Sequence, residues 1–186
     1  MIISASRRTD IPSTHCKWFL ERLKDKYVLV QNPFNKNKFY KVDLSKENVD
    51  IIVFWSKNPN IDFLEEVRNM GYKFYIHFTI TAYDKNIEKN IPNKELLIKK
   101  FINISDRFKK DKIVWRYDPI ILNKEFNSNY HIKNFSYISN ALKNYTDECI
   151  FSFVQIYSKI KNVFKDINND IEERKNLIND LKEIAS

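Results

Sequence analysis

The stretch Val49–Ile80, VDIIVFWSKNPNIDFLEEVRNMGYKFYIHFTI, decides the fold. Two short runs rich in β-branched and aromatic residues, Val49–Trp55 and Lys73–Ile80, flank a more polar segment whose apolar residues have helical spacing. That segment, Asp62–Met70, stops at Gly71, a residue type that commonly follows the last turn of a helix. A strand, a helix and a second strand in this order predict a βαβ unit with parallel strands.

The same alternation continues in both directions along the chain. Further apolar runs predict strands over Met1–Ala5, Lys112–Tyr117 and Cys149–Val154. Helical spacing predicts helices over Pro12–Lys26, Asn93–Phe108, Asn129–Tyr145 and Asp170–Ala185. Strands that alternate with helices indicate one parallel sheet with right-handed crossovers.

One segment departs from this alternation. Tyr27–Gln31 and Lys38–Val42 flank a polar turn, which predicts a β-hairpin inserted after the first helix. We therefore expect an α/β fold: an incomplete (β/α) TIM-like barrel of about five parallel strands in the order 1-2-3-4-5, with an inserted hairpin. Because a complete barrel takes about 250 residues and this chain has 186, the alternatives are a truncated chain, an open sheet, or self-association through the open sheet edge.

The composition excludes several classes of function. A single glycine leaves no glycine-rich phosphate loop. No apolar run approaches the roughly 18 residues of a membrane span, and the N-terminus MIISASRRTD lacks the apolar stretch of a secretory signal, so we expect a cytoplasmic protein without a membrane partner. The two cysteines, Cys16 and Cys149, cannot hold a metal or cluster alone, and without HExxH or CxxC motifs we expect no metal site.

The formal charge of +8 has two interpretations. It could indicate a nucleic-acid partner, or it could reflect the heavy use of Lys, Asn and Ile. We favour the second, because the lysines are spread along the chain. Lys36–Lys41 alternates lysines with aromatic residues in the predicted hairpin, which could stack on bases or pack one face onto the barrel; we favour packing.

Polar residues follow the predicted strands at the end where parallel α/β folds place their sites. They suggest a cationic pocket for a phosphate, a carboxylate or a nucleotide, because arginines and lysines dominate. The candidate ligand-binding residues are Arg7, Arg8, Lys57, Asn58, His77 and Arg116, and the candidate catalytic residues are Asp10 and Asp118. The carboxylates would orient the arginines or accept a substrate proton.

Most candidates also have a structural interpretation. Arg7 and Arg8 could be a surface pair. Asp10 could cap the helix that begins at Pro12, and we favour this over catalysis. Arg116 and Asp118 could form an ion pair with no further role. His77 could equally be a satisfied core histidine, and we take the remaining histidines, His15 and His131, as structural or surface residues.

Six stretches carry a family resemblance over essentially the whole chain, most specifically SASRRTDIP (4–12) and VWRYDPIIL (114–122). With these motifs the sequence resembles domain of unknown function family 1848. Longer members of that family look similar to radical-SAM proteins of the spore photoproduct lyase kind. For these longer members the resemblance implies SAM and an iron–sulfur cluster, and a cysteine-rich segment near their C-terminus is expected to hold the cluster. This chain lacks that segment, so we expect residues 1–186 to be a single α/β domain that matches the N-terminal part of a longer family domain.

Three hypotheses follow. The first is an enzyme-derived, radical-SAM-like domain without its iron–sulfur segment, which binds an anionic small molecule or nucleotide. The second is a nucleic-acid-binding module, suggested by the charge and the aromatic hairpin. The third is a gene fragment with no independent function.

Overall fold

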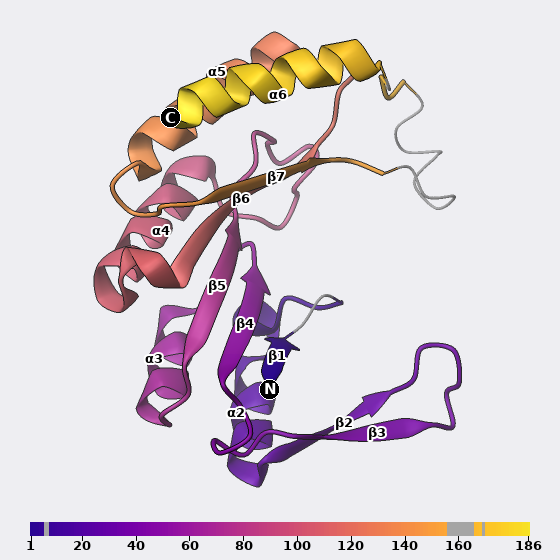
Figure 1. The fold of residues 1–186 in the computed structure, drawn as a ribbon, viewed down its shortest axis with the longest axis vertical. Helices are drawn as coiled ribbons and strands as arrows, with labels where there is room; N and C mark the ends of the chain where they lie inside the picture. Colours follow the sequence, from indigo (N-terminus) through magenta and orange to yellow (C-terminus); the bar gives the residue numbers. More distant parts are fainter. Residues whose placement is uncertain (6–7, 156–165, 169) are drawn as a thin grey trace. The chain divides into compact units, whose positions relative to one another are not determined.

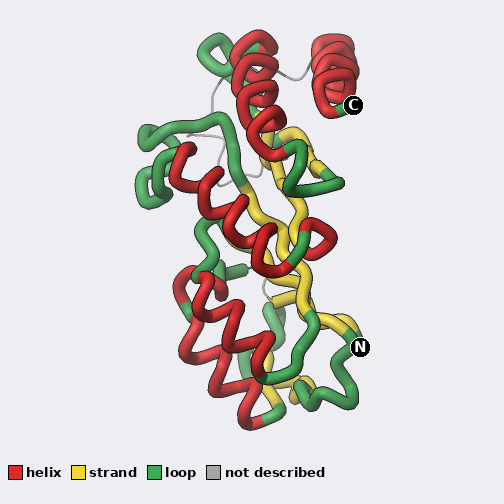
Figure 2. The backbone as a smooth tube through the Cα atoms, turned by 90° about the vertical axis from the view of Figure 1, so that its left-hand side faces the viewer, coloured by secondary structure: helices red, strands yellow, loops and turns green. Residues whose placement is uncertain are grey.

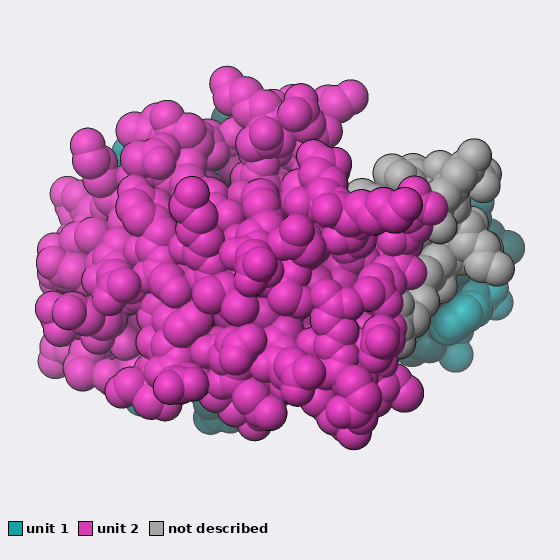
Figure 3. Space-filling model, turned by 90° about the horizontal axis from the view of Figure 1, so that it is seen from above, with its two compact units in different colours: residues 1–78 teal, residues 79–186 magenta. Residues whose placement is uncertain are grey.

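The computed structural model describes residues 1–5, 8–155, 166–168 and 170–186, and it contains two compact units, Met1–Phe78 and Thr79–Ser186 (Figure 3). The first unit contains β1 (Ile2–Ala5), α1 (Ile11–Thr14), α2 (Cys16–Asp25), β2 (Tyr27–Gln31), β3 (Phe39–Asp43), β4 (Ile51–Ser56), α3 (Ile61–Asn69) and all but the last residue of β5 (Phe74–Thr79). The second contains α4 (Lys94–Phe108), the 3₁₀ turn η1 (Lys110–Lys112), β6 (Ile113–Ile120), α5 (Ser128–Leu142), β7 (Cys149–Phe153) and α6 (Ile171–Ala185).

The parallel strands follow the order β1-β4-β5-β6-β7, and β2 and β3 form an antiparallel sheet of their own (Figure 1). The predicted α/β class, the five-stranded parallel sheet and the separate hairpin are confirmed. The predicted order 1-2-3-4-5 numbered the parallel strands alone, whereas the labels β1 to β7 also number the two hairpin strands, β2 and β3. In the described part of the chain, no helix is long and apolar enough to cross a membrane. A single domain over residues 1–186 stays a prediction.

The core of the first unit lies between β4 and two helices on the same side of it (Figure 2). Phe54 of β4 is fully buried, and its ring contacts Phe19 of α2 at 5.7 Å and Phe63 of α3 at 5.3 Å between ring centroids. Alternate residues of a strand point to the same face, so Ile52 and Ile76 share this buried face and their neighbours face the other way. The unit therefore has one face of the sheet covered by helices and an opposite face that they do not cover.

The helix predicted over Pro12–Lys26 is two helices, and this part of the prediction is wrong. His15, between α1 and α2, has φ −129° and ψ 28°, which is outside helical geometry. The Thr14 hydroxyl donates to the Asp10 carbonyl at 2.7 Å and lies 2.7 Å from Nδ1 of His15. Such local side-chain hydrogen bonds compete with the helix ladder and favour a break.

The helix α3 ends as the sequence predicts. Gly71 has φ +85°, where a side chain would strain the backbone, and its N–H donates to the Arg68 carbonyl at 2.8 Å. The chain then turns directly into β5. This confirms the βαβ unit that the fold prediction started from.

The hairpin packs less than the sequence suggests. Its base is half-buried, but the outer parts of both strands are exposed on both faces. Phe34 at the tip is 97% exposed, and Phe39 and Tyr40 are 55% and 46% exposed. The favoured interpretation, one face packed on the sheet, therefore fails beyond the hairpin base.

The second unit is built on β6 and β7, with α5 on one face. Trp115 and Tyr117 of β6 are buried against Phe135 of α5, at ring-centroid distances of 4.7 and 5.2 Å. The fully buried Leu177 and Leu181 belong to α6, and the hydroxyl of Ser128 in α5 donates to the carboxylate of Glu173 in α6 at 2.9 Å. The remaining face of β6 therefore carries Arg116 and Asp118.

Candidate functional site

Asp10 links the segment after β1 to the segment after β4. Its Oδ1 accepts the backbone N–H of Ser13 at 3.1 Å, which caps α1, and its Oδ2 accepts the backbone N–H of Lys57 at 2.9 Å. Side-chain caps of this kind contribute about 0.5–2 kcal/mol. These contacts support the capping interpretation, and a catalytic role for Asp10 stays a prediction.

The turn after β4 is held by further backbone contacts. The Oγ of Ser56, which is only 4% exposed, accepts the N–H of Asn58 at 3.1 Å. The N–H of Asn60 donates to the Pro12 carbonyl at 2.8 Å, which ties this turn to α1 a second time. The structure therefore brings Asp10 together with the Lys57–Asn58 turn, and both side chains of that turn are half-buried.

Trp55 and His77 form a stacked pair on the face of the sheet opposite α2 and α3. The register of β4 against β5 sets them opposite each other, with ring centroids 4.1 Å apart and planes 13° from parallel. Trp55 Nε1 donates to Ser4 Oγ of β1 at 3.0 Å, and the Tyr75 ring meets His77 edge-on at 5.2 Å. Both rings of the pair are half-buried, so they offer a fixed aromatic surface one residue from the Ser56–Asn58 turn.

The two predicted arginines of the first unit are placed differently. Arg7 lies outside the described residues. Arg8 is exposed and lines an apolar pocket beside β1, together with Ser4 and Gln31. Arg8 is thus assigned to a pocket whose lining includes neither Lys57 nor His77.

In the second unit, Arg116 and Asp118 form an ion pair on one face of β6. Their charged atoms are 2.5 Å apart, and their side chains are 15% and 23% exposed. The hydroxyl of Ser152 in β7 donates to the other oxygen of Asp118. Asp118 therefore lies between a guanidinium and a hydroxyl. This arrangement agrees with the interpretation of a structural ion pair, and a catalytic role for Asp118 stays a prediction.

The cysteines do not fit an iron–sulfur cluster. Such clusters are held by three or four thiolates, and the chain has two cysteines, one in each unit. Burial raises the pKa of the Cys16 thiol and raises that of Cys149 to about 12, so both are protonated at neutral pH. Among the described residues, no group of three or more His, Cys, Asp or Glu side chains could hold a metal ion.

The sequence reasoning missed the partner of His77. Trp55 was visible at the end of its strand, but its contact with His77 depends on the register between two strands, which single-strand patterns do not encode. The role of Ser152 was missed for the same reason. His131 is fully buried, in agreement with its predicted structural role.

Comparison with known proteins identifies the family of the chain but no individual relative. No curated protein and no solved structure matches the chain. A family profile described as Domain of unknown function (DUF1848) matches residues 2–186, which contain all the motifs described above. The chain therefore belongs to the DUF1848 family of domains of unknown function.

Proposed function

We propose that the first unit binds a nucleotide, with the base on the Trp55–His77 pair and the phosphates at the Lys57–Asn58 turn. The observation that carries this proposal is the stacked pair, fixed 4.1 Å apart on the sheet face opposite the helices. Aromatic side chains bind bases by stacking, with about 1–3 kcal/mol per base. The pair and the turn both lie at the carboxyl ends of β4 and β5, where α/β proteins bind their ligands.

The charge around the turn supports an anionic ligand. Lys57 supplies a positive charge at the turn, and the carboxylate of Asp10, which accepts the N–H groups of Ser13 and Lys57, offsets it in part. The chain as a whole carries +8, which attracts anions over longer distances. We further interpret the parallel strands as part of a TIM-like barrel.

The proposal is one of binding. A radical-SAM reaction would need three or four cluster thiolates, and Cys16 and Cys149 supply two at most.

Titration with ADP and with adenosine tests the proposal. Trp55→Ala is expected to weaken both ligands by about 10- to 100-fold, because both lose the stacking surface. Lys57→Ala is expected to weaken ADP about tenfold and to leave adenosine unchanged, because only ADP carries phosphates. Isothermal titration calorimetry gives the affinities.

Two matched variants of the same unit serve as controls. Trp18→Ala removes an exposed tryptophan outside the site, and Lys36→Ala removes an exposed lysine of the hairpin turn. Both are expected to bind ADP like the wild type. The nucleotide proposal is rejected if the wild type does not bind ADP at about 1 mM, or if Trp55→Ala binds it unchanged.

The hairpin favours a second candidate function, the binding of single-stranded nucleic acid. Lys38 lies 5.4 Å from the ring centroid of Tyr40, and Lys41 lies 4.4 Å from that of Tyr27. With the exposed rings of Phe34 and Phe39, the hairpin offers stacking surfaces next to positive charge.

For this second function, we expect a fluorescent 12-mer oligonucleotide to bind with an affinity that falls as salt rises from about 50 to 200 mM. Phe39→Ala is expected to weaken binding about tenfold through lost stacking, measured by fluorescence anisotropy. Tyr137→Ala, at an exposed aromatic residue of the second unit, is the control. Equal binding by the wild type and Phe39→Ala at low salt would exclude the hairpin as the contact surface.

A further inference from the structure

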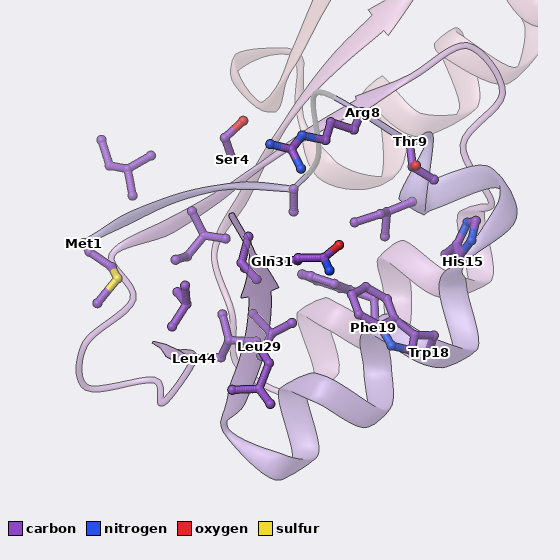
Figure 4. A pocket seen from close by; sticks show the side chains of 17 residues that line it. Met1, Ser4, Arg8, Thr9, His15, Trp18, Phe19, Leu29, Gln31 and Leu44 are labelled. Carbon is purple, nitrogen blue, oxygen red and sulfur yellow. The ribbon is translucent and has the colours of Figure 1, made fainter. Parts of the chain in front are cut away.

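The first unit contains an apolar pocket beside β1 that does not involve Trp55, His77 or Lys57. It has a volume of about 770 Å³ and is bounded by β1, by the turn into α2 and by the base of the hairpin (Figure 4). This volume lies within the range of about 300–1,000 Å³ that is typical of small-molecule sites. Twelve of its 17 lining residues are apolar.

Large apolar side chains of this pocket are exposed to solvent to an unusual degree. Ile2 is 70% exposed, Leu29 is 58% exposed and Trp18 is 43% exposed, although they come from three different elements. Exposed apolar side chains that gather at one concave surface mark binding sites. A ligand that fills the pocket would therefore need an apolar body.

The charge of the lining defines the head group of that ligand. Arg8 is a lining residue with a permanent positive charge, and none of the described residues that line the pocket carries a carboxylate side chain. In Figure 4 the guanidinium of Arg8 extends over the pocket towards Ser4, and the Gln31 amide lies below it. One end of the pocket thus suits a single anionic group, and the rest is apolar.

We propose that this pocket binds a free medium-chain carboxylate, with its head group at Arg8 and its aliphatic chain between Ile2, Trp18 and Leu29. The proposal is independent of nucleotide binding, because the two sites share no residue. A concave site of this volume has room for one whole small molecule, and Arg8 is the one arginine or lysine among its described lining residues, which favours a free amphiphile with one head group over a lipid surface.

Decanoate and decanol test the head group and the apolar chain separately. The wild type is expected to bind decanoate at least tenfold more tightly than decanol, because only decanoate interacts with the guanidinium. Arg8→Ala is expected to weaken decanoate about tenfold and to leave decanol unchanged. Leu29→Asp is expected to weaken both ligands more than tenfold, because it places a charge among the apolar groups.

Leu96→Ala is the control, since Leu96 is an exposed apolar residue outside the pocket lining. Affinities come from calorimetry on the full chain, and circular dichroism spectra check that each variant is folded. Absence of decanoate binding at about 1 mM overturns the proposal, as does an equal loss of both ligands in Arg8→Ala. Analytical ultracentrifugation tests whether a second copy of the chain fills the pocket instead. A dimer that persists in decanoate and that the Leu29→Asp substitution dissociates would also overturn the proposal.

Trp55→Ala separates this proposal from nucleotide binding. That variant is expected to bind decanoate like the wild type. Failure of ADP binding with intact decanoate binding would reject the nucleotide site alone, and the opposite pattern would reject the carboxylate pocket alone.

Discussion

Replacing Phe54 with alanine is expected to destabilise the protein by about 3–5 kcal/mol. The side chain is fully buried on the helix-covered face of β4, where its ring contacts Phe19, Phe63 and Phe74. Truncation removes these contacts and leaves a cavity between two helices and the sheet, which rigid neighbours fill only in part. Urea unfolding followed by far-UV circular dichroism measures the loss.

The neighbouring residue provides the control for this prediction. Trp55 points to the opposite face and is half-buried, so Trp55→Ala is expected to lose a smaller amount, about 1–2 kcal/mol. The same variant is expected to bind ADP about 10- to 100-fold more weakly, whereas Phe54→Ala, where folded, is expected to bind ADP like the wild type. Equal destabilisation by the two substitutions would contradict the division into a helix-covered face and a less packed face.

The sequence was sufficient for the elements of the fold because each carries its own local signal. Ile51–Trp55 consists of β-branched and aromatic residues, which favour a strand, and Gly71 marks the end of α3 because it adopts a positive φ. The signal at Pro12 was also sufficient to favour Asp10 as a cap. These features depend on a few consecutive residues, so no knowledge of the rest of the chain is needed.

The contacts of the candidate site could not be predicted from the sequence, because they join residues that are far apart along the chain. The N–H of Lys57 reaches Asp10 across 47 positions, and Trp55 reaches Ser4 across 51. His77 stacks on Trp55 only in the register that the structure adopts, and a shift of one residue would move it to the other face. The break at His15 and the exposure of the hairpin likewise depend on side-chain contacts and packing that residue periodicity does not report.

His131 provides the last large expected effect, a loss of stability in mild acid. Its side chain is fully buried in the second unit, with Nε2 2.9 Å from the Ile121 carbonyl and Nδ1 2.9 Å from the Tyr117 hydroxyl. A carbonyl only accepts hydrogen bonds, so Nε2 carries the proton and Nδ1 accepts from Tyr117. This pairing satisfies the neutral ring. Burial lowers the pKa of His131 in the folded state.

The direction of the pH dependence follows from that lowered pKa. Below about pH 6.5 the unfolded chain binds a proton at residue 131 that the folded chain does not bind, so the free energy of unfolding decreases as the pH falls. We expect a slope of about 1.4 kcal/mol per pH unit between pH 6.5 and the folded-state pKa, and full retention of this contribution above pH 6.5. Urea unfolding at intervals from pH 7.5 to 5.5 measures it.

Two variants identify the titrating group. His131→Gln keeps a donor for the Ile121 carbonyl but does not titrate, so it is expected to be less stable at pH 7.5 by about 1–3 kcal/mol and to lose the acid-side slope. Tyr117→Phe removes the hydrogen bond to Nδ1 and retains the imidazole, so it is expected to keep that slope. If His131→Gln retains the wild-type slope, another group titrates. The result bears on the candidate site, because Ile121 is only three residues after Asp118. His131 donates to the Ile121 carbonyl, and the Ile121 N–H donates to the Tyr83 hydroxyl at 2.7 Å, so both side chains fix the backbone of this segment.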